Sequence, residues 1–385
     1  MLSSPFHFPS YHVPPETEGL REEVREFLAE MSSHWSGWDI GHSWTGFNRE
    51  FSREVGKRGW IGMAWSKAYG GHERSVVERY VVVEEMLAAG APVGAHWVAD
   101  RQSGPLILRH GNEAQKQTLL PRIARGEAAF CIGLSEPDSG SDLASLRARA
   151  EKVSDGWLLN GRKIWTTYAR ECDFMIGLFR SSGSPEQKQK GLSQFLIDLT
   201  VPGIEINPIR DLTGESHFNE IVFDNVLLPE DSLVGEEGNG WAQVNAELAY
   251  ERSGPDRYLS SYPLLPAAID ALNENTMDRL SARAVGLAFT DITVLREMSL
   301  SILNQLGEGK TPLQEAAVTK LLGTELEQDM PELVRSLLDC SPSIDPHHTL
   351  SHMQGYLTQS VPSFSLRGGT NEIMRGIIAR GLGLR

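Results

Sequence analysis

The sequence contains few cysteines and a minority of basic residues. Only three of its 385 residues are cysteines, Cys131, Cys172 and Cys340. Such an odd and sparse set excludes a disulfide framework and is typical of a reducing compartment. The 36 Lys and Arg residues are outnumbered by 51 Asp and Glu residues, which gives a formal net charge of −15. Because no dense basic run is present, a nucleic-acid-binding function is not expected.

The sequence also has no long apolar segment. No apolar run reaches the roughly 18 residues that a membrane-spanning helix requires. The first residues lack the basic and apolar regions of a secretory signal. We therefore expect a cytoplasmic protein that does not enter a membrane.

The remaining composition is that of a globular protein. Hydrophobic residues make up 40% of the chain and charged residues 23%, which excludes wholesale disorder. Apolar residues recur at helical spacing before residue 129 and again after Gly240, whereas short apolar runs separated by turn residues occupy the region between. We therefore expect the chain to be helical, then β, then helical.

Two pairs of turn-forming residues lie within the expected β region, which begins near Ala129. Asp155-Gly156 precedes Trp157, and Asn160-Gly161 precedes the run Arg162–Thr167. An Asn-Gly pair between apolar runs favours a type I′ turn, because both central residues of that turn have positive φ. We therefore predict a hairpin that turns at Asn160-Gly161. Further strands are expected at Phe174–Phe179, Leu192–Leu199, Ile204–Pro208 and Glu220–Phe223.

The densest group of small polar residues follows the apolar run Phe130–Ile132. This stretch, Leu134–Asp142, contains Ser135, Gly140 and Ser141. Hydroxyl groups and free backbone amides suit a phosphate or the edge of a planar ring, and glycine allows a ligand to approach the backbone. A simple turn at the end of a strand explains the same residues equally well.

A second candidate is Trp165-Thr166-Thr167. An indole can stack on a planar ring, and Thr167 is expected on the same face as Trp165 because side chains alternate along a strand. One face then offers a stacking surface beside a hydroxyl group. The alternative is ordinary core packing.

A third candidate is Tyr250-Glu251-Arg252, at the end of a helix expected over Trp241–Arg252. If the Glu251 carboxylate lies against apolar surface, desolvation raises its pKa and makes it a better base. The alternative is a solvated Glu-Arg pair.

A fourth candidate is Gly368-Gly369 followed by Thr370, which suits the N-cap of a helix whose amides can hold an anionic or polarised oxygen. No Gly-x-Gly-x-x-Gly motif is present, so a Rossmann dinucleotide site is not supported. His347, His348 and His352 have no Cys or acidic partner at ligand spacing, so we expect no metal site.

Taken together and in this order, these stretches resemble the acyl-CoA dehydrogenase family over essentially the whole chain. Three further stretches support the resemblance: Gly59–Gly71, Leu120–Glu127 and Asn160–Thr167. The resemblance implies an α+β fold in three domains. These are an N-terminal helical domain (1–128), a central β-barrel or β-sandwich domain (129–236) and a C-terminal four-helix bundle (237–385).

The resemblance also implies the chemistry. Members of the family use FAD to oxidise an acyl-CoA thioester to its trans-2-enoyl form in lipid metabolism. A base removes the α-proton, the β-hydrogen leaves as hydride to the flavin, and the thioester carbonyl accepts hydrogen bonds from a flavin hydroxyl and a backbone amide. The electrons then pass to an electron-transfer flavoprotein.

Family motifs assign roles to residues at matching positions of this chain. Residues implied to line the flavin ring and pyrophosphate are Ile132, Leu134, Ser135, Gly140 and Ser141. Residues implied to contact the ring from the strand are Trp165, Thr166 and Thr167, with Trp165 over one face and Thr167 near N5. Residues implied to meet the flavin from the last domain are Thr370, Asn371 and Glu372. Residues implied to lie beside the acyl-CoA are Ser141, Arg252, Gly368 and Gly369.

The family places its catalytic base at one of two positions. Most members carry it immediately before the Gly-Thr of the last motif, where this chain has Gly368. Other members, including isovaleryl-CoA, long-chain and some steroid-type enzymes, carry it immediately before the Arg that ends the first C-terminal helix. That residue is Glu251 here, so the resemblance implies that Glu251 is the base and that the Gly368 amide contacts the carbonyl.

Two family motifs are missing. Members usually carry Arg-x-x-Phe-Gly, which binds the FAD diphosphate of a neighbouring subunit, but Leu272–Ala288 contains no such motif. The Gln-x-x-Gly-Gly-x-Gly motif is absent from Leu337–Gln354. This pattern resembles the α2β2 enzymes of steroid side-chain breakdown, in which a paralogous partner supplies the diphosphate contacts. The alternatives are a homo-oligomer with altered FAD contacts, an FAD oxidase, a flavin-poor subunit and a flavin monooxygenase.

Overall fold

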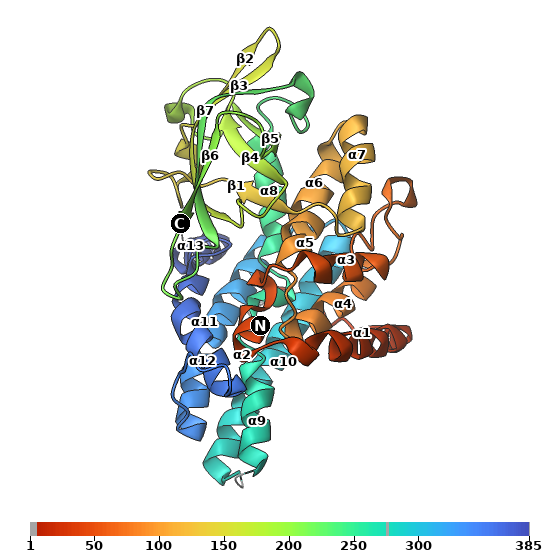
Figure 1. The fold of residues 1–385 in the computed structure, drawn as a ribbon, viewed down its shortest axis with the longest axis vertical. Helices are drawn as coiled ribbons and strands as arrows, with labels where there is room; N and C mark the ends of the chain where they lie inside the picture. The colour runs from red at the N-terminus through yellow and green to blue at the C-terminus, as the bar shows by residue number, and fades with distance from the viewer. Residues whose placement is uncertain (1–5, 275–276, 385) are drawn as a thin grey trace. The chain divides into compact units, whose positions relative to one another are not determined.

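The computed structural model describes residues 6–274 and 277–384, except for the side chains of residues 248–251 and 273–274. Contacts within the chain divide it into two units (Figure 1). The first unit contains the residues up to Gly46, Arg74–Gly94 and the residues from Ala249 onward. The second unit contains Phe47–Glu73 and Ala95–Leu248. Each unit is described on its own.

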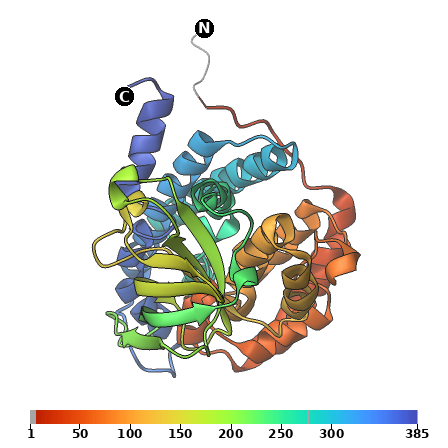
Figure 2. The same cartoon turned by 90° about the horizontal axis from the view of Figure 1, so that it is seen from above.

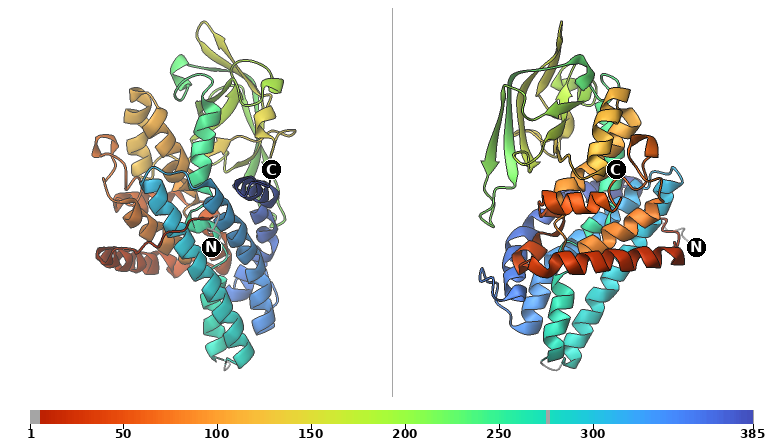
Figure 3. Two further views of the ribbon diagram at one scale, coloured as in Figure 1. Left: turned by 180° about the vertical axis from the view of Figure 1, so that it is seen from behind. Right: turned by 45° about the vertical axis from the view of Figure 1, so that its right-hand side comes forward.

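The first unit is helical, and its long helices pack along one another (Figure 3). Helix α11 contacts α9, α10, α12 and α13, so it is central to this unit, while α1 packs against α4 and α12 against α2. The helices of this unit are α1 (Glu18–Met31), α2 (Gly37–His42), α4 (Val76–Ala88), α9 (Leu264–Glu274), α10 (Arg279–Gly307), α11 (Leu313–Leu338), α12 (Thr349–Ser360) and α13 (Asn371–Gly381).

The amphipathic pattern of α1 explains why it is a surface helix with one buried face. Leu20, Val24, Phe27 and Leu28 recur at the spacing of one helical face, and all four are buried. Helix α4 begins with a capping box in which Ser75 accepts a hydrogen bond from the backbone N–H of Glu78, while the Glu78 carboxylate accepts from the Ser75 N–H. This cap satisfies two amide groups that have no partner within the helix.

The second unit contains a curled sheet of seven strands, seen from above in Figure 2. The strand order is β1-β4-β2-β3-β7-β6, with β5 paired to β4. The strands are β1 (Phe130–Gly133), β2 (Arg149–Val153), β3 (Gly156–Thr167), β4 (Phe174–Arg180), β5 (Leu192–Asp198), β6 (Ile204–Ile209) and β7 (Phe218–Leu228). The helices of this part of the chain are α3 (Arg49–Lys57), α5 (Gly94–Val98), α6 (Gly104–His110) and α7 (Glu113–Ala124), and α8 (Gly240–Glu251) leads from it into the first unit.

The predicted α+β class, with helices before and after a β region, is confirmed. The four strands expected after residue 170 are present as β4 to β7. The helix expected over Trp241–Arg252 is α8, displaced by one residue at each end. None of the described helices is both long enough and apolar enough to cross a membrane.

The prediction of a hairpin turn at Asn160-Gly161 is wrong. The chain turns earlier, at Ser154-Asp155, where Val153 of β2 pairs with Gly156 of β3, and β3 continues through Asn160-Gly161. The pairing of β3 with β7 shifts at this point, as in a β-bulge. Gly161 has a φ of 137°, and a Cβ added there would lie 2.6 Å from the Cβ of Ala148. The glycine is therefore required for close contact with a neighbouring segment and not for a turn.

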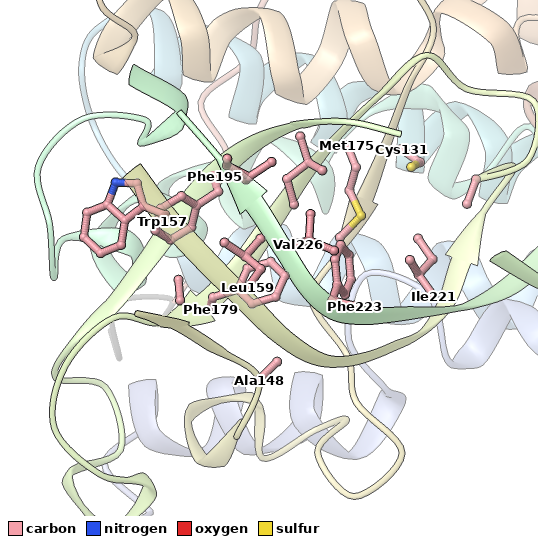
Figure 4. Close-up of a cluster of buried hydrophobic side chains, with 14 residues drawn as sticks. Cys131, Ala148, Trp157, Leu159, Met175, Phe179, Phe195, Ile221, Phe223 and Val226 are labelled. Atoms are coloured by element: carbon pink, nitrogen blue, oxygen red, sulfur yellow. The ribbon is translucent and has the colours of Figure 1, made fainter. Parts of the chain in front are cut away.

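The core of the second unit lies on one face of this sheet (Figure 4). Trp157 packs edge-on against Phe195, with ring centroids 5.1 Å apart, and Phe179 packs edge-on against Phe223 at 5.2 Å. Leu159 and Val226 are fully buried among these rings. Burial of one such aliphatic side chain contributes about 1.5–3 kcal/mol.

Replacement of Leu159 by Ala is expected to lower the free energy of unfolding by about 2–5 kcal/mol, because it leaves a cavity in a close-packed core. The matched control is Leu212→Ala, because Leu212 is 75% exposed and its loss should change stability by less than about 0.5 kcal/mol. Urea unfolding of both variants provides the measurement. Equal stabilities of the two variants would contradict the assignment of this core.

Candidate functional site

The predicted site residues form two groups, one in each unit. Those in the second unit are Ile132, Leu134, Ser135, Gly140, Ser141, Trp165, Thr166 and Thr167. Those in the first unit are Glu251, Arg252, Gly368, Gly369, Thr370, Asn371 and Glu372.

In the second unit, β1 leads directly into the predicted polar turn. Ile132 and Leu134 are half-buried at the end of the strand. The turn closes on itself, because Ser139 donates its N–H to the Glu136 carbonyl at 3.0 Å and its hydroxyl to the Asp142 carbonyl at 2.7 Å. Gly140 is exposed, and no described atom lies within 4 Å of a Cβ placed there. The packing of this chain therefore does not itself require a glycine at this position.

A buried ion pair joins the turn to β3. The Lys163 ammonium, which is fully buried, donates to the Glu136 carboxylate at 2.8 Å and to the Leu134 carbonyl at 3.2 Å. The same carboxylate accepts the backbone N–H groups of Arg147 at 2.7 Å and Ala148 at 2.9 Å. Burial lowers the pKa of Lys163, against the opposing effect of Glu136. The sequence did not indicate this pair, because no local pattern connects two residues 27 positions apart.

Trp165 stands out from the rest of β3. Its side chain is 56% exposed although the residue is a large aromatic, and its backbone has a left-handed φ of 61°. The pairing with β7 shifts between Lys163 and Thr166, so regular alternation is interrupted here. A non-glycine residue in this region of φ and ψ is strained, and such strain is concentrated at functional sites.

The surroundings of Trp165 explain how it is held in place. Its ring packs edge-on against Phe218, with centroids 5.9 Å apart. The preceding residue, Ile164, donates its N–H to the Ser135 carbonyl at 2.9 Å, which brings the polar turn beside this part of β3. Thr166 is buried and Thr167 half-buried. An exposed, edge-supported indole beside a polar turn suits a planar aromatic ligand that also offers hydrogen-bonding groups.

In the first unit, Arg252 connects the end of α8 to the Gly-Gly turn. Its guanidinium Nε donates to the Gly368 carbonyl at 3.0 Å, and the residue is only 8% exposed. Glu251 is the last residue of α8, and its side chain lies outside the described residues. The hydrogen bond therefore links the side chain of the residue that follows Glu251 to the turn that contains Gly368.

The structure explains why position 368 has no side chain. Gly368 has a left-handed φ of 66°, and a Cβ placed there would lie 3.0 Å from the Arg257 guanidinium. Gly369 has a φ of 96°, and its Cβ would lie 2.9 Å from the end of Met374. Both the left-handed backbone and the close approach of Arg257 favour glycine over a larger residue at position 368.

The turn leads into α13 as expected. The Thr370 hydroxyl accepts the Ile373 N–H at 3.3 Å and forms the N-cap. The Asn371 carboxamide accepts a hydrogen bond from the Lys320 ammonium of α11 at 3.0 Å. Glu372 is exposed in the first turn of the helix, where an acidic residue is favourable.

Lys320 is a buried cation that the sequence did not identify. It is fully buried, and its ammonium also donates to the Ser365 carbonyl at 3.3 Å. Burial, together with the guanidinium groups of Arg257 and Arg367, lowers the pKa of Lys320 to about 7. The sequence gave no indication that Lys320 is buried, because a lysine in a helical pattern is ordinarily a surface residue.

A hollow of about 530 Å³ lies beside the polar turn in the second unit. Its charged lining includes Arg147 and Arg162, but also Glu136, Asp138 and Glu186. Because these charges are mixed, they do not select for an anion, and we assign no ligand to the hollow. Across residues 6–274 and 277–384, no three His, Cys, Asp or Glu side chains are grouped so that they could hold a metal ion.

Two family models match the chain. Residues 14–127 match the acyl-CoA dehydrogenase N-terminal domain, and residues 131–226 match the acyl-CoA dehydrogenase middle domain. The acyl-CoA dehydrogenase FadE29 of Mycobacterium tuberculosis is 31% identical to this chain, over 95% of this chain and 96% of that protein.

Solved structures agree with this match. The structure named Tcur3481-Tcur3483 steroid ACAD has a TM-score of 0.87 and 26% identity, covering 97% of this chain and 99% of the other. The ChsE4-ChsE5 complex from Mycobacterium tuberculosis has a TM-score of 0.84 and 26% identity, covering 98% of this chain and 100% of the other.

The lowered pKa of Lys320 predicts a pH-dependent contribution to stability. Between a folded pKa of about 7 and an unfolded value of about 10.4, the unfolded chain binds the proton that the folded chain has released. The free energy of unfolding therefore rises with pH in this window, by at most about 1.4 kcal/mol per pH unit from this group.

The test compares wild type with Lys320→Met by urea unfolding at pH 7, 8 and 9. The stability of wild type relative to the variant should increase with pH. The matched control is Lys310→Met, because the Lys310 side chain is 57% exposed, and its stability difference should not increase. A constant difference for Lys320→Met would show that this lysine does not titrate in the window.

Proposed function

Because the chain belongs to the acyl-CoA dehydrogenase family, we propose that it uses FAD to oxidise an acyl-CoA thioester to the trans-2-enoyl-CoA. We propose an electron-transfer flavoprotein as the electron acceptor. The observation that carries the proposal is the exposed Trp165 in a strained backbone, beside the polar turn that follows β1. A chain that had lost its flavin would have no reason to keep an exposed indole in an unfavourable conformation.

The residues of the second unit fit a flavin ring. Trp165 offers an exposed indole, and Thr167 offers the hydroxyl of a half-buried residue two positions later. We assign the ring and pyrophosphate contacts to Ile132, Leu134, Ser135, Gly140, Ser141, Trp165, Thr166 and Thr167, and further flavin contacts to Thr370, Asn371 and Glu372. When bound, FAD supplies the hydride acceptor.

The residues of the first unit are assigned to the thioester. An α-proton is only weakly acidic, so a base has to remove it while the carbonyl oxygen is polarised. We assign the base to Glu251 and the polarising hydrogen bond to the Gly368 N–H. Arg252 and Gly369, and separately Ser141 of the second unit, are assigned to the surroundings of the acyl-CoA.

The geometry around Gly368 supports this division of roles. Residue 368 has no side chain, and its left-handed backbone beside the Arg257 guanidinium favours glycine there. The Arg252–Gly368 hydrogen bond connects the turn to the residue that follows Glu251. The family uses two positions for its base. Of these two, only the position at the end of α8 carries an acidic residue in this chain.

We further propose that the chain works with a paralogous partner subunit. Leu272–Ala288 and Leu337–Gln354 lack the motifs that bind a neighbour's FAD diphosphate in the family. The similar ChsE4-ChsE5 structure is a complex of two proteins. A partner that supplies these motifs would complete the adenosine half of the cofactor site.

An oxidase is the second candidate function, since the same fold and cofactor serve electron transfer to oxygen. The structure named Prolyl Acyl Carrier Protein Oxidase AnaB shares the fold with a TM-score of 0.83. Release of hydrogen peroxide during turnover would favour the oxidase, and reduction of an electron-transfer flavoprotein would favour the dehydrogenase.

Glu251→Gln is expected to lower turnover of acyl-CoA by several powers of ten while FAD remains bound, because removal of an essential base removes the proton acceptor. The measurement is steady-state turnover together with the visible spectrum of the bound flavin. Glu237→Gln serves as control, because Glu237 is an exposed residue just before α8. Turnover near the wild-type value in the Glu251 variant would refute the assignment of the base.

The chain purified alone is expected to contain less than one FAD per chain, and co-expression with the paralogous partner is expected to restore full occupancy. The reason is the missing diphosphate motifs. Occupancy follows from the ratio of flavin to protein absorbance, and subunit composition follows from native mass. A yellow homotetramer with full occupancy would show that no partner is required.

A further inference from the structure

Three residues of α11 form one face that meets two separate segments of the first unit. Lys320, Gly323 and Glu327 are spaced at i, i+3 and i+7, so they lie along one side of the helix. One segment is Arg252–Ser260, which follows Glu251. The other is Ser365–Asn371, which contains the Gly-Gly turn.

The Glu327 carboxylate binds both segments, one with each oxygen. Oε1 accepts the backbone N–H of Ser260 at 2.8 Å. Oε2 accepts from the Arg367 guanidinium at 2.5 Å. Glu327 is fully buried, and the Arg367 side chain is 14% exposed. A charged hydrogen-bonded pair in these surroundings is strong, and loss of one partner leaves the other charge buried without compensation.

Arg367 extends this link. The same nitrogen that contacts Glu327 also donates to the Ser260 hydroxyl at 2.8 Å and to the Asp256 carbonyl at 3.2 Å. Its guanidinium carbon lies 3.8 Å from the centre of the Phe364 ring. The residue immediately before Gly368 is therefore tied to the segment that follows Glu251.

The other two residues of the α11 face, Gly323 and Lys320, contact the same two segments. A Cβ at Gly323 would lie 2.1 Å from the Arg257 carbonyl, so the glycine permits the first segment to lie directly on the helix. Lys320 binds Ser365 and Asn371, the two ends of the second segment. The same helix face thus contacts both segments at more than one point.

We propose that Glu327 is a positioning residue, which sets the Gly368 N–H in register with the segment that directly follows the base. The inference rests on the proposed function, because the position of the Gly368 N–H affects catalysis only if this group binds the thioester carbonyl. Proton abstraction requires the carbonyl donor and the base to be placed together, and small displacements of either lower the rate strongly. Glu327 touches neither substrate nor cofactor in this scheme and acts through Arg367 and Ser260.

The experiment uses the FAD-loaded protein, purified with its partner if the partner is required. Glu327→Gln keeps the size of the side chain and an oxygen that can accept from Ser260, but it replaces the oxygen facing Arg367 by an amide donor. The matched control is Glu332→Gln on the same helix, because Glu332 is 67% exposed and pairs with Arg335.

Two readouts are compared, using the acyl-CoA that the wild-type protein turns over fastest. Hydrogen–deuterium exchange, measured without acyl-CoA, should increase in Ser365–Asn371 more than in Arg252–Ser260. The kcat should fall at least about tenfold while KM changes less than about threefold. Glu332→Gln should change neither exchange nor kcat.

Several outcomes would overturn the inference. Unchanged exchange in Ser365–Asn371 would show that Glu327 does not hold the turn. A loosened turn with wild-type kcat would show that the link is structural only. If Glu327→Gln does not fold, Arg367→Lys tests the same link from the other side, and an unchanged kcat in that variant would equally refute it.

Failure of the proposed function is distinguishable from failure of this inference. If the wild-type protein turns over no acyl-CoA, the proposed function is wrong. The catalytic role proposed for Glu327 is then wrong as well. The exchange experiment then still decides whether Glu327 joins the two segments, because it needs no substrate. Glu251→Gln provides the opposite case, since it should abolish turnover and leave exchange in Ser365–Asn371 unchanged.

Discussion

The hydrogen bond between Arg252 and Gly368 is the constraint on which the first unit's part of the site depends. It connects two residues that are 116 positions apart in the chain. One follows the proposed base and the other belongs to the turn proposed to bind the thioester carbonyl. Because the two groups have to act on adjacent atoms of the same substrate, their separation has to be fixed by the protein. The buried network around Glu327 supports the same arrangement from the opposite side.

The second unit depends on a different buried contact. The Lys163–Glu136 ion pair holds the polar turn against β3 and leaves the outer surface of the strand to Trp165. The turn is therefore rigid on its inner side, where the Glu136 carboxylate also accepts two backbone amides. On its outer side, Gly140 and Ser141 are exposed and have room for a ligand. A rigid support beneath an exposed polar surface is the arrangement that a binding site needs.

The replacement of an acidic residue by glycine at position 368 has consequences beyond the loss of a carboxylate. Without a side chain the turn takes a left-handed conformation and approaches the Arg257 guanidinium. Four cations of this unit, Arg252, Arg257, Lys320 and Arg367, are buried in the same region, together with Asp256 and Glu327. Arg257 pairs with Asp256 and Arg367 pairs with Glu327, so the two carboxylates balance part of this positive charge within the unit. The similarity to enzymes of known structure extends over the whole chain, so these local differences are changes within a shared fold.

The sequence alone determined the class of fold, the family and the order of the motifs, because helical periodicity, alternating strands and small-residue turns are local properties of the chain. Local preference failed at Asn160-Gly161, because the pairing of β2 with β3 places the turn earlier, at Ser154-Asp155, and the pairing of β3 with β7 shifts at Gly161. It also failed to indicate the left-handed backbone of Trp165, which depends on a shift in that pairing. The roles of Lys163, Lys320 and Glu327 were decided by tertiary structure alone. Each of these charged side chains forms its buried contact only because the fold brings in a partner from far away in the sequence and removes both groups from water.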